Sequence, residues 1–434
     1  YEHLDRLVEI FNVCWPMYAA MPAVLKDAIE RSYVNAGWDL RKSQNKYNER
    51  LFPNFIDVLQ QIDEVMDMSQ YSSDNKGDYK GALSTRLRSL TNGINGLVFS
   101  ADEIPAEDLF DKNVIIDLSR VGSSETKSLI MGLLVMKLQE HRIAACDGMN
   151  AALNHVTVLE EAHNLLKRTS TEQYSEGANL LGKSVEMLTN AIAEMRTYGE
   201  GFIIADQSPG LLDMAVIRNT NTKIIMRLPE YSDRELVGRA AGLKDEQIVE
   251  LSKLNKGVAA IYQNDWIESV LCKVKKYFGD APEYKFEIKG TAEYHDIKGE
   301  IISRLIAKDF MHLVDTVDEE LIVSDIPVAA KCRLFDYVSA PDAQKFDLAS
   351  ALAYELFCAG NVFSALAKSK YDFEQQKRFI IEHLTPSIAP LTEQYSRLIL
   401  CLVTYWNAHI TESTLTKNLL NYLIETGEKE DRVN

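Results

Sequence analysis

Hydrophobic residues recur every three or four positions through most of the first 105 residues, which predicts a series of amphipathic helices. Pro16 and Pro22 interrupt this pattern, and Gly37 is typical of a residue that ends a helix. The polar stretch at 69–81 predicts a loop, and a short basic helix is expected at 82–94. The clearest helical segments are LVEIFNVCW, AVLKDAIERSYVNAG and FPNFIDVLQQIDEVMDM.

The pattern changes after about residue 106, where short apolar runs begin to alternate with helical stretches. Continuous apolar runs predict strands that are buried on both faces, and their alternation with helices indicates a parallel α/β sheet. The last two runs are separated only by Asn264 and Asp265, which predicts an antiparallel hairpin at the sheet edge. The predicted strands lie at 113–118, 155–160, 201–206, 222–228, 257–263 and 266–274.

From about residue 286 the pattern is helical to the end, and the strongest segments are LASALAYELFCAGNVFSALAKS and YSRLILCLVTYWNAH. We therefore predict three parts. These are a helical segment over 1–105, an α/β core over 106–285 and a helical interaction domain over 286–434.

Composition and charge restrict the class of protein. Of the 434 residues, 46% are hydrophobic and 26% are charged, which is typical of a globular chain rather than a disordered one. The net charge is −17, with an excess of acids both before and after residue 290. Such a chain does not wrap nucleic acid with its whole surface, although a few basic loops could still bind it.

Cysteine spacing and hydropathy indicate the compartment. The six cysteines lie far apart and show no metal-finger spacing, which favours reduced thiols in a cytoplasmic protein. No apolar run approaches the roughly 20 residues that span a bilayer, so we expect no membrane partner.

The segment HVTVLEEAHNLL carries the most specific chemistry, because a buried strand ends there in Glu160 and Glu161. Ligands bind at the carboxyl ends of strands in open α/β sheets. Two adjacent acids there suit phosphate-ester chemistry: one can hold Mg²⁺, and the next can orient and deprotonate the attacking water. This is the Walker B pattern of nucleotide hydrolases. The plainer interpretation is a strand that ends in two solvated acids.

The next predicted strand ends in Asp206, Gln207 and Ser208, and parallel strands bring their carboxyl ends to the same sheet edge. A glutamine in that position can sense the γ-phosphate or the lytic water. Alternatively, its amide only caps the following turn.

Four motifs in order resemble those of the HerA/FtsK superfamily of ring-forming, P-loop DNA translocases, and of HerA-type ATPases in particular. They are EEAHN at 160–164, RTYG at 196–199, QSP at 207–209 and the strand NTNTKIIMRL at 219–228. The resemblance covers about residues 1–280. Each motif alone is weak, whereas their order and spacing together are specific.

This resemblance implies a RecA-like P-loop NTPase fold with a mostly parallel sheet, an N-terminal helical insertion and a C-terminal all-α region. It implies ATP and Mg²⁺ as cofactors. Glu161 would be the catalytic base, Gln207 the sensor and Glu160 the Mg²⁺ ligand. Members of the family more often carry aspartate at the position of Glu160, and the longer glutamate would coordinate the ion through water.

The resemblance also implies an assembly. Arg196 would act as an arginine finger toward the neighbouring subunit of a homo-hexamer, with Arg218 and Arg227 as rivals for this role. The expected partners are double-stranded DNA and a nuclease, as in DNA repair, or another effector in antiphage defence.

Nucleotide hydrolases need a phosphate loop of the form GxxxxGK[ST], and the chain holds one literal match at 177–184. The residues before it are polar rather than a buried strand, and Leu180, Ser184, Met187 and Leu188 fall on one helical stripe. We therefore predict a helix here, away from the phosphates. The resemblance places the true phosphate loop before residue 1.

Two other functions stay open. The chain could be a regulatory or scaffold subunit that keeps the ATPase fold without turnover and binds an effector through its helical C-terminal region. It could also be a protein-secretion motor of the same superfamily, which would need a membrane-recruiting segment.

Overall fold

The computed structural model describes residues 1–384 except Pro16, Asp147, Met149, 169–175, 280–295, Lys308 and Cys358. The helix predicted near 395–409 lies outside the described residues. The chain divides into two compact units. The helical unit comprises Ala23–Glu103 and Lys289–Asn434, and the sheet unit comprises Glu2–Pro22 and Ile104–Ile288.

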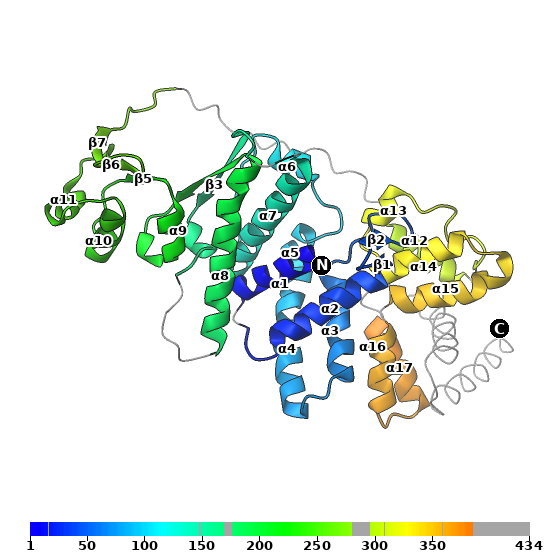
Figure 1. The fold of residues 1–434 in the computed structure, drawn as a ribbon. Coiled ribbons are helices and arrows are strands. Elements are labelled where there is room, and N and C mark those ends of the chain that lie inside the picture. The colour runs from blue at the N-terminus through cyan, green and yellow to red at the C-terminus, as the bar shows by residue number, and fades with distance from the viewer. Residues whose placement is uncertain are drawn as a thin grey trace. The chain divides into compact units, whose positions relative to one another are not determined.

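The helical unit combines segments from both ends of the chain (Figure 1). Its N-terminal part also holds a two-residue antiparallel pair, β1 (Trp38–Asp39) with β2 (Gln44–Asn45). Its helices are α2 (Met21–Asn35, which begins in the sheet unit), α3 (Phe55–Met68), α4 (Ser73–Thr91), α5 (Gly93–Val98), α12 (Ile297–Ile306), α13 (Glu319–Val323), α14 (Val328–Val338), α15 (Asp342–Leu356), α16 (Ala359–Lys368) and α17 (Phe373–Leu384).

Helix α4 contradicts the predicted loop at 69–81, because the helix begins at Ser73. The Ser72 hydroxyl accepts a hydrogen bond from the Asn75 backbone N–H and caps the helix. Tyr79, Leu83 and Leu87 are buried at spacings of four. The tertiary packing of this apolar stripe outweighs the polar residues between them, which misled the sequence interpretation.

The two segments of the helical unit share a core. Ala36 and Leu51 pack with Val328 and Cys332. The carboxylate of Asp57 accepts hydrogen bonds from the backbone N–H groups of Asn54 and of Val328, at 2.8 and 3.0 Å. The sequence did not reveal this connection between residues 23–103 and the C-terminal helices. The three-part division of the chain stays a prediction.

The sheet unit holds the strands that carry the candidate chemistry (Figure 1). Strands β3 and β4 are parallel, in a register that pairs His155 with Glu200 and Glu160 with Ala205. Strands β5, β6 and β7 form a separate antiparallel sheet. The elements are α1 (Glu2–Cys14), α6 (Ala106–Phe110), α7 (Ser124–Ala145), β3 (His155–Glu160), α8 (Glu176–Glu194), β4 (Glu200–Ala205), α9 (Met214–Asn219), β5 (Thr222–Ile225), α10 (Tyr231–Ala240), α11 (Asp245–Glu250), β6 (Val258–Gln263) and β7 (Val270–Lys273).

Helix α7 packs closely against α1 at Gly132. A Cβ atom at this position would lie 2.7 Å from Cγ2 of Ile10, so only glycine permits the contact.

Five of the six predicted strands are present, and the sixth is not. Residues 113–118 form no strand, and Ile115 is 95% exposed. A strand needs a neighbouring backbone to satisfy its hydrogen bonds, and among the described residues this segment has none. The predicted burial on both faces also fails, because Val158 and Ile203 of the parallel pair are more than half exposed. The antiparallel β6–β7 hairpin is confirmed, although its loop is longer than predicted.

A buried carboxylate fastens the amino ends of β3 and β4. The side chain of Glu200 is fully buried and accepts hydrogen bonds from Nε of Arg142, Nδ1 of His155 and Oγ1 of Thr157, at 2.8, 2.8 and 2.7 Å. Arg142 also pairs with Asp111 at 2.6 Å. A buried charge is tolerated when partners satisfy it in this way.

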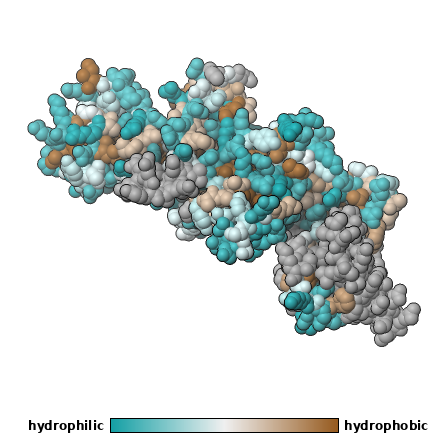
Figure 2. All heavy atoms as spheres, turned by 60° about the horizontal axis from the view of Figure 1, so that its bottom comes forward, coloured by the Kyte–Doolittle hydropathy of each residue, from teal (hydrophilic) through white to brown (hydrophobic). Residues whose placement is uncertain are grey.

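No helix within the described ranges combines the length and the apolar character needed to cross a bilayer. On the face drawn in Figure 2, hydrophobic residues are scattered within a largely hydrophilic surface. Among the described residues, Cys14, Cys146, Cys272 and Cys332 are free thiols.

Asp57 gives the helical unit a testable pH dependence. Burial raises the pKa of its carboxyl to about 6, although two backbone hydrogen bonds and the charge of Lys331 oppose the shift. The folded protein therefore keeps a proton that the unfolded chain releases at about pH 4. This contribution to stability is present at low pH and is lost as pH rises toward 6.

We expect the unfolding free energy of the wild type, relative to Asp57→Asn, to fall by up to ~3 kcal/mol between about pH 4 and about pH 7. Urea unfolding of both proteins across this range measures the difference. A difference that does not change with pH would contradict the assignment.

Candidate active site

The turn after β3 is strained at Glu161. This residue follows Glu160, the last residue of the strand, and has φ 51° and ψ 46° in the left-handed region. Such a conformation costs a non-glycine residue energy and is concentrated at functional sites. A short 3₁₀ turn, Ala162–Asn164, follows at once. The strain turns the chain sharply at the carboxyl end of the strand.

Glu161 and Gln207 meet at this end of the sheet. Nε2 of Gln207 donates a hydrogen bond to Oε1 of Glu161 at 2.8 Å. The register explains the contact, because Glu160 pairs with Ala205 and the next residues of both strands leave the sheet together. The Glu161 side chain is 47% exposed, and its second oxygen, Oε2, lies 3.7 Å from Nδ1 of His163 on a side that water can reach. The structure thus brings together two residues that the sequence singled out separately.

Asp206 organises this site, a role that the sequence analysis did not assign to it although it placed the residue at the end of the second strand. Its side chain is only 2% exposed and accepts hydrogen bonds from Nδ1 of His163 at 2.8 Å and from the His163 backbone N–H at 2.9 Å. It also accepts one from the backbone N–H of Ser208 at 2.9 Å. This carboxylate therefore fixes both the turn that carries Glu161 and the turn that carries Gln207. The signal in the sequence was an acid at the end of the neighbouring parallel strand.

Glu160 is exposed at the end of β3, beside this hydrogen-bonded turn. A free carboxylate oxygen is the kind of ligand that Mg²⁺ takes, and the ion commonly needs only one or two protein carboxylates besides phosphates and water. Among the described residues, no group of three or more histidine, cysteine or acidic side chains is placed to bind a metal. The donor set therefore fits an ion shared with a nucleotide rather than a closed protein cage.

Arg196 lies at the opposite, amino end of these two strands. It belongs to a 3₁₀ turn, Met195–Tyr198, that precedes β4, whereas Glu161 follows β3. The length of a six-residue strand separates its amino end from its carboxyl end by roughly 17 Å. Gly199 closes the turn with φ 80°, and a Cβ atom there would lie 2.5 Å from the carbonyl oxygen of Ala152. Arg196 is exposed and cannot reach Glu161 of its own chain.

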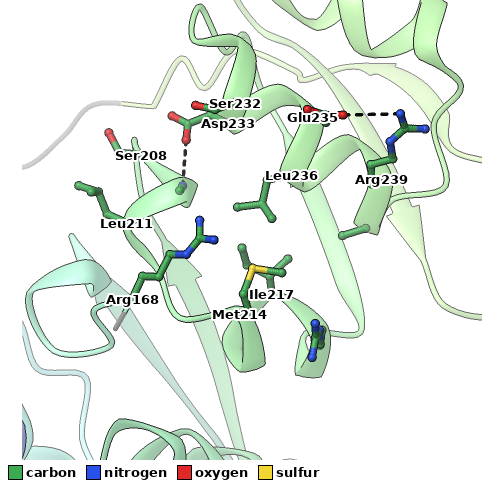
Figure 3. Close-up of a pocket in the computed structure, with 13 residues that line it drawn as sticks. Arg168, Ser208, Leu211, Met214, Ile217, Ser232, Asp233, Glu235, Leu236 and Arg239 are labelled. Carbon is green, nitrogen blue, oxygen red and sulfur yellow. Dashed lines mark hydrogen bonds and ion pairs between the residues drawn. The ribbon is translucent and has the colours of Figure 1, made fainter. Parts of the chain in front are cut away.

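The rival arginines lie elsewhere. Nε of Arg227 donates to the backbone carbonyl of Ser252 at 3.1 Å. Arg218 lines a cavity of about 900 Å³ that begins just beyond Gln207, at Ser208. Figure 3 shows Arg168 extending over this cavity, with Met214 and Leu236 directed into it.

The literal phosphate-loop match is part of a helix. Residues 177–184 fall within α8, and Ser184 is buried, with its hydroxyl bonded to the carboxylate of Glu9. Lys183 is exposed on the same helix. A phosphate loop presents its backbone N–H groups to the ligand, whereas the helix uses those of residues 180–184 for its own hydrogen bonds. The prediction of a helix here is confirmed.

Sequence comparison finds helicase relatives. The chain is 25% identical over 284 residues to the DNA double-strand break repair helicase HerA of Sulfurisphaera tokodaii, which covers 64% of this chain and 53% of the relative. It is 25% identical over 169 residues to the HerA of Sulfolobus acidocaldarius, covering 38% and 32%. A probable helicase of Methanocaldococcus jannaschii is 25% identical over 174 residues, covering 39% and 32%. The chain spans about half the length of the first relative.

Solved structures give partial matches. VirB4 of Thermoanaerobacter pseudethanolicus aligns with a TM-score of 0.42 and 16% identity, over 64% of this chain and 69% of that one. The genome-packaging NTPase B204 of Sulfolobus turreted icosahedral virus 2 aligns at 0.28 and 13% identity, over 43% and 78%. Superpositions at these scores do not define a shared fold. No family model matches the chain.

Lys183→Ala tests the helical assignment of the phosphate-loop match. Because Lys183 lies on the exposed side of α8, we expect the affinity for ATP to change by less than about twofold, as for an ordinary surface substitution. Titration of the full-length protein with a fluorescent ATP analogue measures it. A large loss of affinity with an unchanged circular dichroism spectrum would show that these residues do bind phosphate.

Proposed function

The chain is a relative of the HerA/FtsK-type P-loop ATPases, and we propose that it is an ATP-hydrolysing subunit of a ring-forming DNA translocase or helicase. The observation that carries this proposal is the 2.8 Å hydrogen bond between Gln207 and Glu161 at the carboxyl ends of two adjacent parallel strands. Glu160 directly precedes Glu161, so a metal-binding acid, a base and an amide would occupy the carboxyl ends of these two strands.

Each residue has a defined task in this proposal. Glu161 accepts the proton of the attacking water, using the carboxylate oxygen that Gln207 does not hold. Gln207 orients that carboxylate, and Asp206 holds both turns through His163 and Ser208. Glu160 is the carboxylate that holds Mg²⁺, which supplies positive charge to the phosphates when it is bound.

The phosphate loop belongs to a part of the protein outside residues 1–434. The support is that the single literal match in this sequence lies inside α8. The carboxylates and the phosphate loop would then come from separate stretches of one longer chain, with a RecA-like sheet that joins them.

The position of Arg196 favours an assembly. An arginine that lies at the edge opposite Glu161 can stabilise the transferred phosphoryl group only from a second subunit. We therefore assign Arg196 as a finger in trans, within a homo-hexamer that acts on double-stranded DNA in the cytoplasm. A nuclease or a defence effector is the expected partner.

The alternative function is a scaffold that does not hydrolyse ATP and binds an effector through its C-terminal helices. It is favoured by the same helical phosphate-loop match, because a chain without such a loop binds nucleotide poorly. A GxxxxGK[ST] motif after a strand elsewhere in the protein would support the motor, and the absence of one would support the scaffold.

Glu161→Gln tests the catalytic base. The amide keeps the shape of the side chain but cannot take a proton, so nucleotide binding should persist while turnover falls by ~10²–10⁴-fold. Glu186→Gln, on the exposed surface of α8, is the matched control and should hydrolyse ATP normally. Steady-state ATPase assays with duplex DNA compare the three proteins. Wild-type turnover in Glu161→Gln would remove the assignment.

Arg196→Ala tests the composite site. The variant should bind ATP without hydrolysing it, and mixing it with Glu161→Gln should restore part of the activity that each parent lacks. Restoration arises because some interfaces then combine an intact Arg196 with an intact Glu161. If activity does not return, Arg196 acts within its own chain or not at all. Parallel mixtures with Arg218→Ala and Arg227→Ala identify the finger among the rivals.

A further inference from the structure

The cavity beside the candidate active site has an apolar floor and a basic rim. Leu211, Met214, Ile217 and Leu236 line it together with three arginines (Figure 3). At about 900 Å³ it is large enough to receive a small ligand or two bulky side chains.

The acids of this cavity are already engaged. Oδ1 of Asp233 accepts a hydrogen bond from the Gly210 backbone N–H at 2.9 Å. Glu235 pairs with Arg239 at 3.6 Å, and Arg239 also pairs with Asp245 at 2.9 Å.

Two arginines keep their charge available. Of the three arginines in the cavity, Arg239 alone pairs with acids among the described residues. Arg168 and Arg218 are exposed at the rim. On a chain of net charge −17, this is a local positive site above an apolar floor.

Backbone hydrogen bonds hold the wall of the cavity that carries Arg168. The Arg168 N–H donates to the carbonyl of Leu211 at 2.7 Å, and the Asp213 N–H donates to the carbonyl of Leu166 at 2.9 Å. Between them, Lys167 and Leu212 form an isolated antiparallel bridge. The cavity is therefore preformed on this side, which lowers the entropic cost of filling it.

The same unit displays a segment with the complementary chemistry. The tip of the β6–β7 hairpin reads Asp265-Trp266-Ile267-Glu268. Ile267 is 100% exposed and Trp266 is 39% exposed, with an exposed acid on each side. An isoleucine that projects fully into solvent beside a tryptophan is typical of a surface that binds a protein.

Hydrogen bonds hold the base of this hairpin tip in place, whereas the side chains at its end are exposed. The Asn264 N–H donates to the carbonyl of Asn221 at 3.1 Å, and the Trp266 N–H donates to the carbonyl of Gln263 at 2.8 Å. Oγ of Ser269 donates to the carbonyl of Ala241 at 2.6 Å. The backbone at the base of the tip is thus held in one position.

We propose that the hairpin tip of one copy of this chain inserts into the cavity of a second copy. Trp266 and Ile267 cover the apolar floor, and Asp265 and Glu268 meet Arg168 and Arg218 at the rim. A nucleic-acid backbone would also be attracted by the two arginines, but it would leave the floor of leucine, methionine and isoleucine unused. A peptide with apolar and acidic side chains matches both parts, and the hairpin tip carries both.

This contact uses none of Glu160, Glu161, Gln207 and Arg196, the residues to which the proposed hydrolysis is assigned, although it does use Arg218, a rival for the finger. It would bring subunits together without nucleotide. A negative result therefore leaves the ATPase proposal standing, and a loss of ATPase activity in Glu161→Gln leaves the contact standing.

The first test is the association of the 434-residue chain, measured by sedimentation velocity over a range of concentrations at low salt without ATP. Ile267→Asp should weaken association by at least about tenfold, because an isoleucine that the proposed contact buries is replaced by a charged residue. The fold should be unaffected, since Ile267 is fully exposed. Ile94→Asp, at an isoleucine that is 80% exposed in the helical unit, is the matched control and should associate like the wild type.

The second test reverses charges across the contact. Glu268→Arg and Arg218→Glu should each weaken association, and the double variant should recover much of it, because the pair is restored with opposite sign. Arg120→Glu, which changes the net charge equally at an exposed site, is the control for Arg218→Glu.

Three outcomes would overturn the proposal. They are a wild-type chain that stays monomeric at all concentrations, association that is indifferent to Ile267→Asp, and charge reversals that show no recovery in the double variant. If Arg218→Glu instead abolishes binding of a duplex oligonucleotide while association is unchanged, the cavity is a nucleic-acid site.

Discussion

The parallel pairing of β3 with β4 is the contact on which the candidate active site depends. Apart from Glu160, which is the last paired residue of β3, the paired residues of the two strands carry none of the candidate chemistry and are largely apolar. The chemistry lies one and two residues beyond the pairing, where Glu161, Asp206 and Gln207 leave the sheet. A slip of the register by one residue would separate Glu161 from Gln207 and turn every strand residue to the opposite face. Whatever fixes the register therefore also fixes the site.

Two buried carboxylates fix it, one at each end of β4. Glu200 begins the strand and bonds to His155 and Thr157 of β3, and Asp206 follows the strand and bonds to His163 in the turn after β3. Each bond crosses from one strand to the other, so neither strand can slide without leaving a buried charge unsatisfied. The strained backbone of Glu161 persists because Asp206 holds His163, two residues further on, through both its backbone N–H and its ring.

The sequence predicted the elements whose structure depends on residues that lie close together in the chain. The spacing of apolar residues predicted strands β3 and β4, which end in Glu160 and Ala205, the helix that contains the phosphate-loop match and the β6–β7 hairpin. The helix at Ser73–Thr91 did not, because its stability comes from packing that a polar sequence conceals. The segment at 113–118 has the composition of a strand, but composition alone cannot supply the neighbouring backbone that a strand requires.

The same limit applies to the site. Adjacent acids after a buried strand pointed to Glu160 and Glu161, and the position of Gln207 after the next strand pointed to the same edge. The role of Asp206 depends on a contact between two turns that lie more than forty residues apart, and only the strand register reveals it. Likewise, the joining of Asp57 to Val328 spans most of the chain, and no local pattern records it.

The placement of Arg196 carries the argument from one chain to an assembly. Its turn is fastened by the hydrogen bond from the Ala151 N–H to the carbonyl of Thr197 and by the close approach of Gly199 to Ala152. The sheet itself therefore sets the distance between this arginine and Glu161, and no side-chain rearrangement can close a gap of roughly 17 Å. A rigid separation within one subunit is what a site shared between two subunits requires. In the composite site proposed above, a neighbouring subunit would therefore supply this arginine to Glu161.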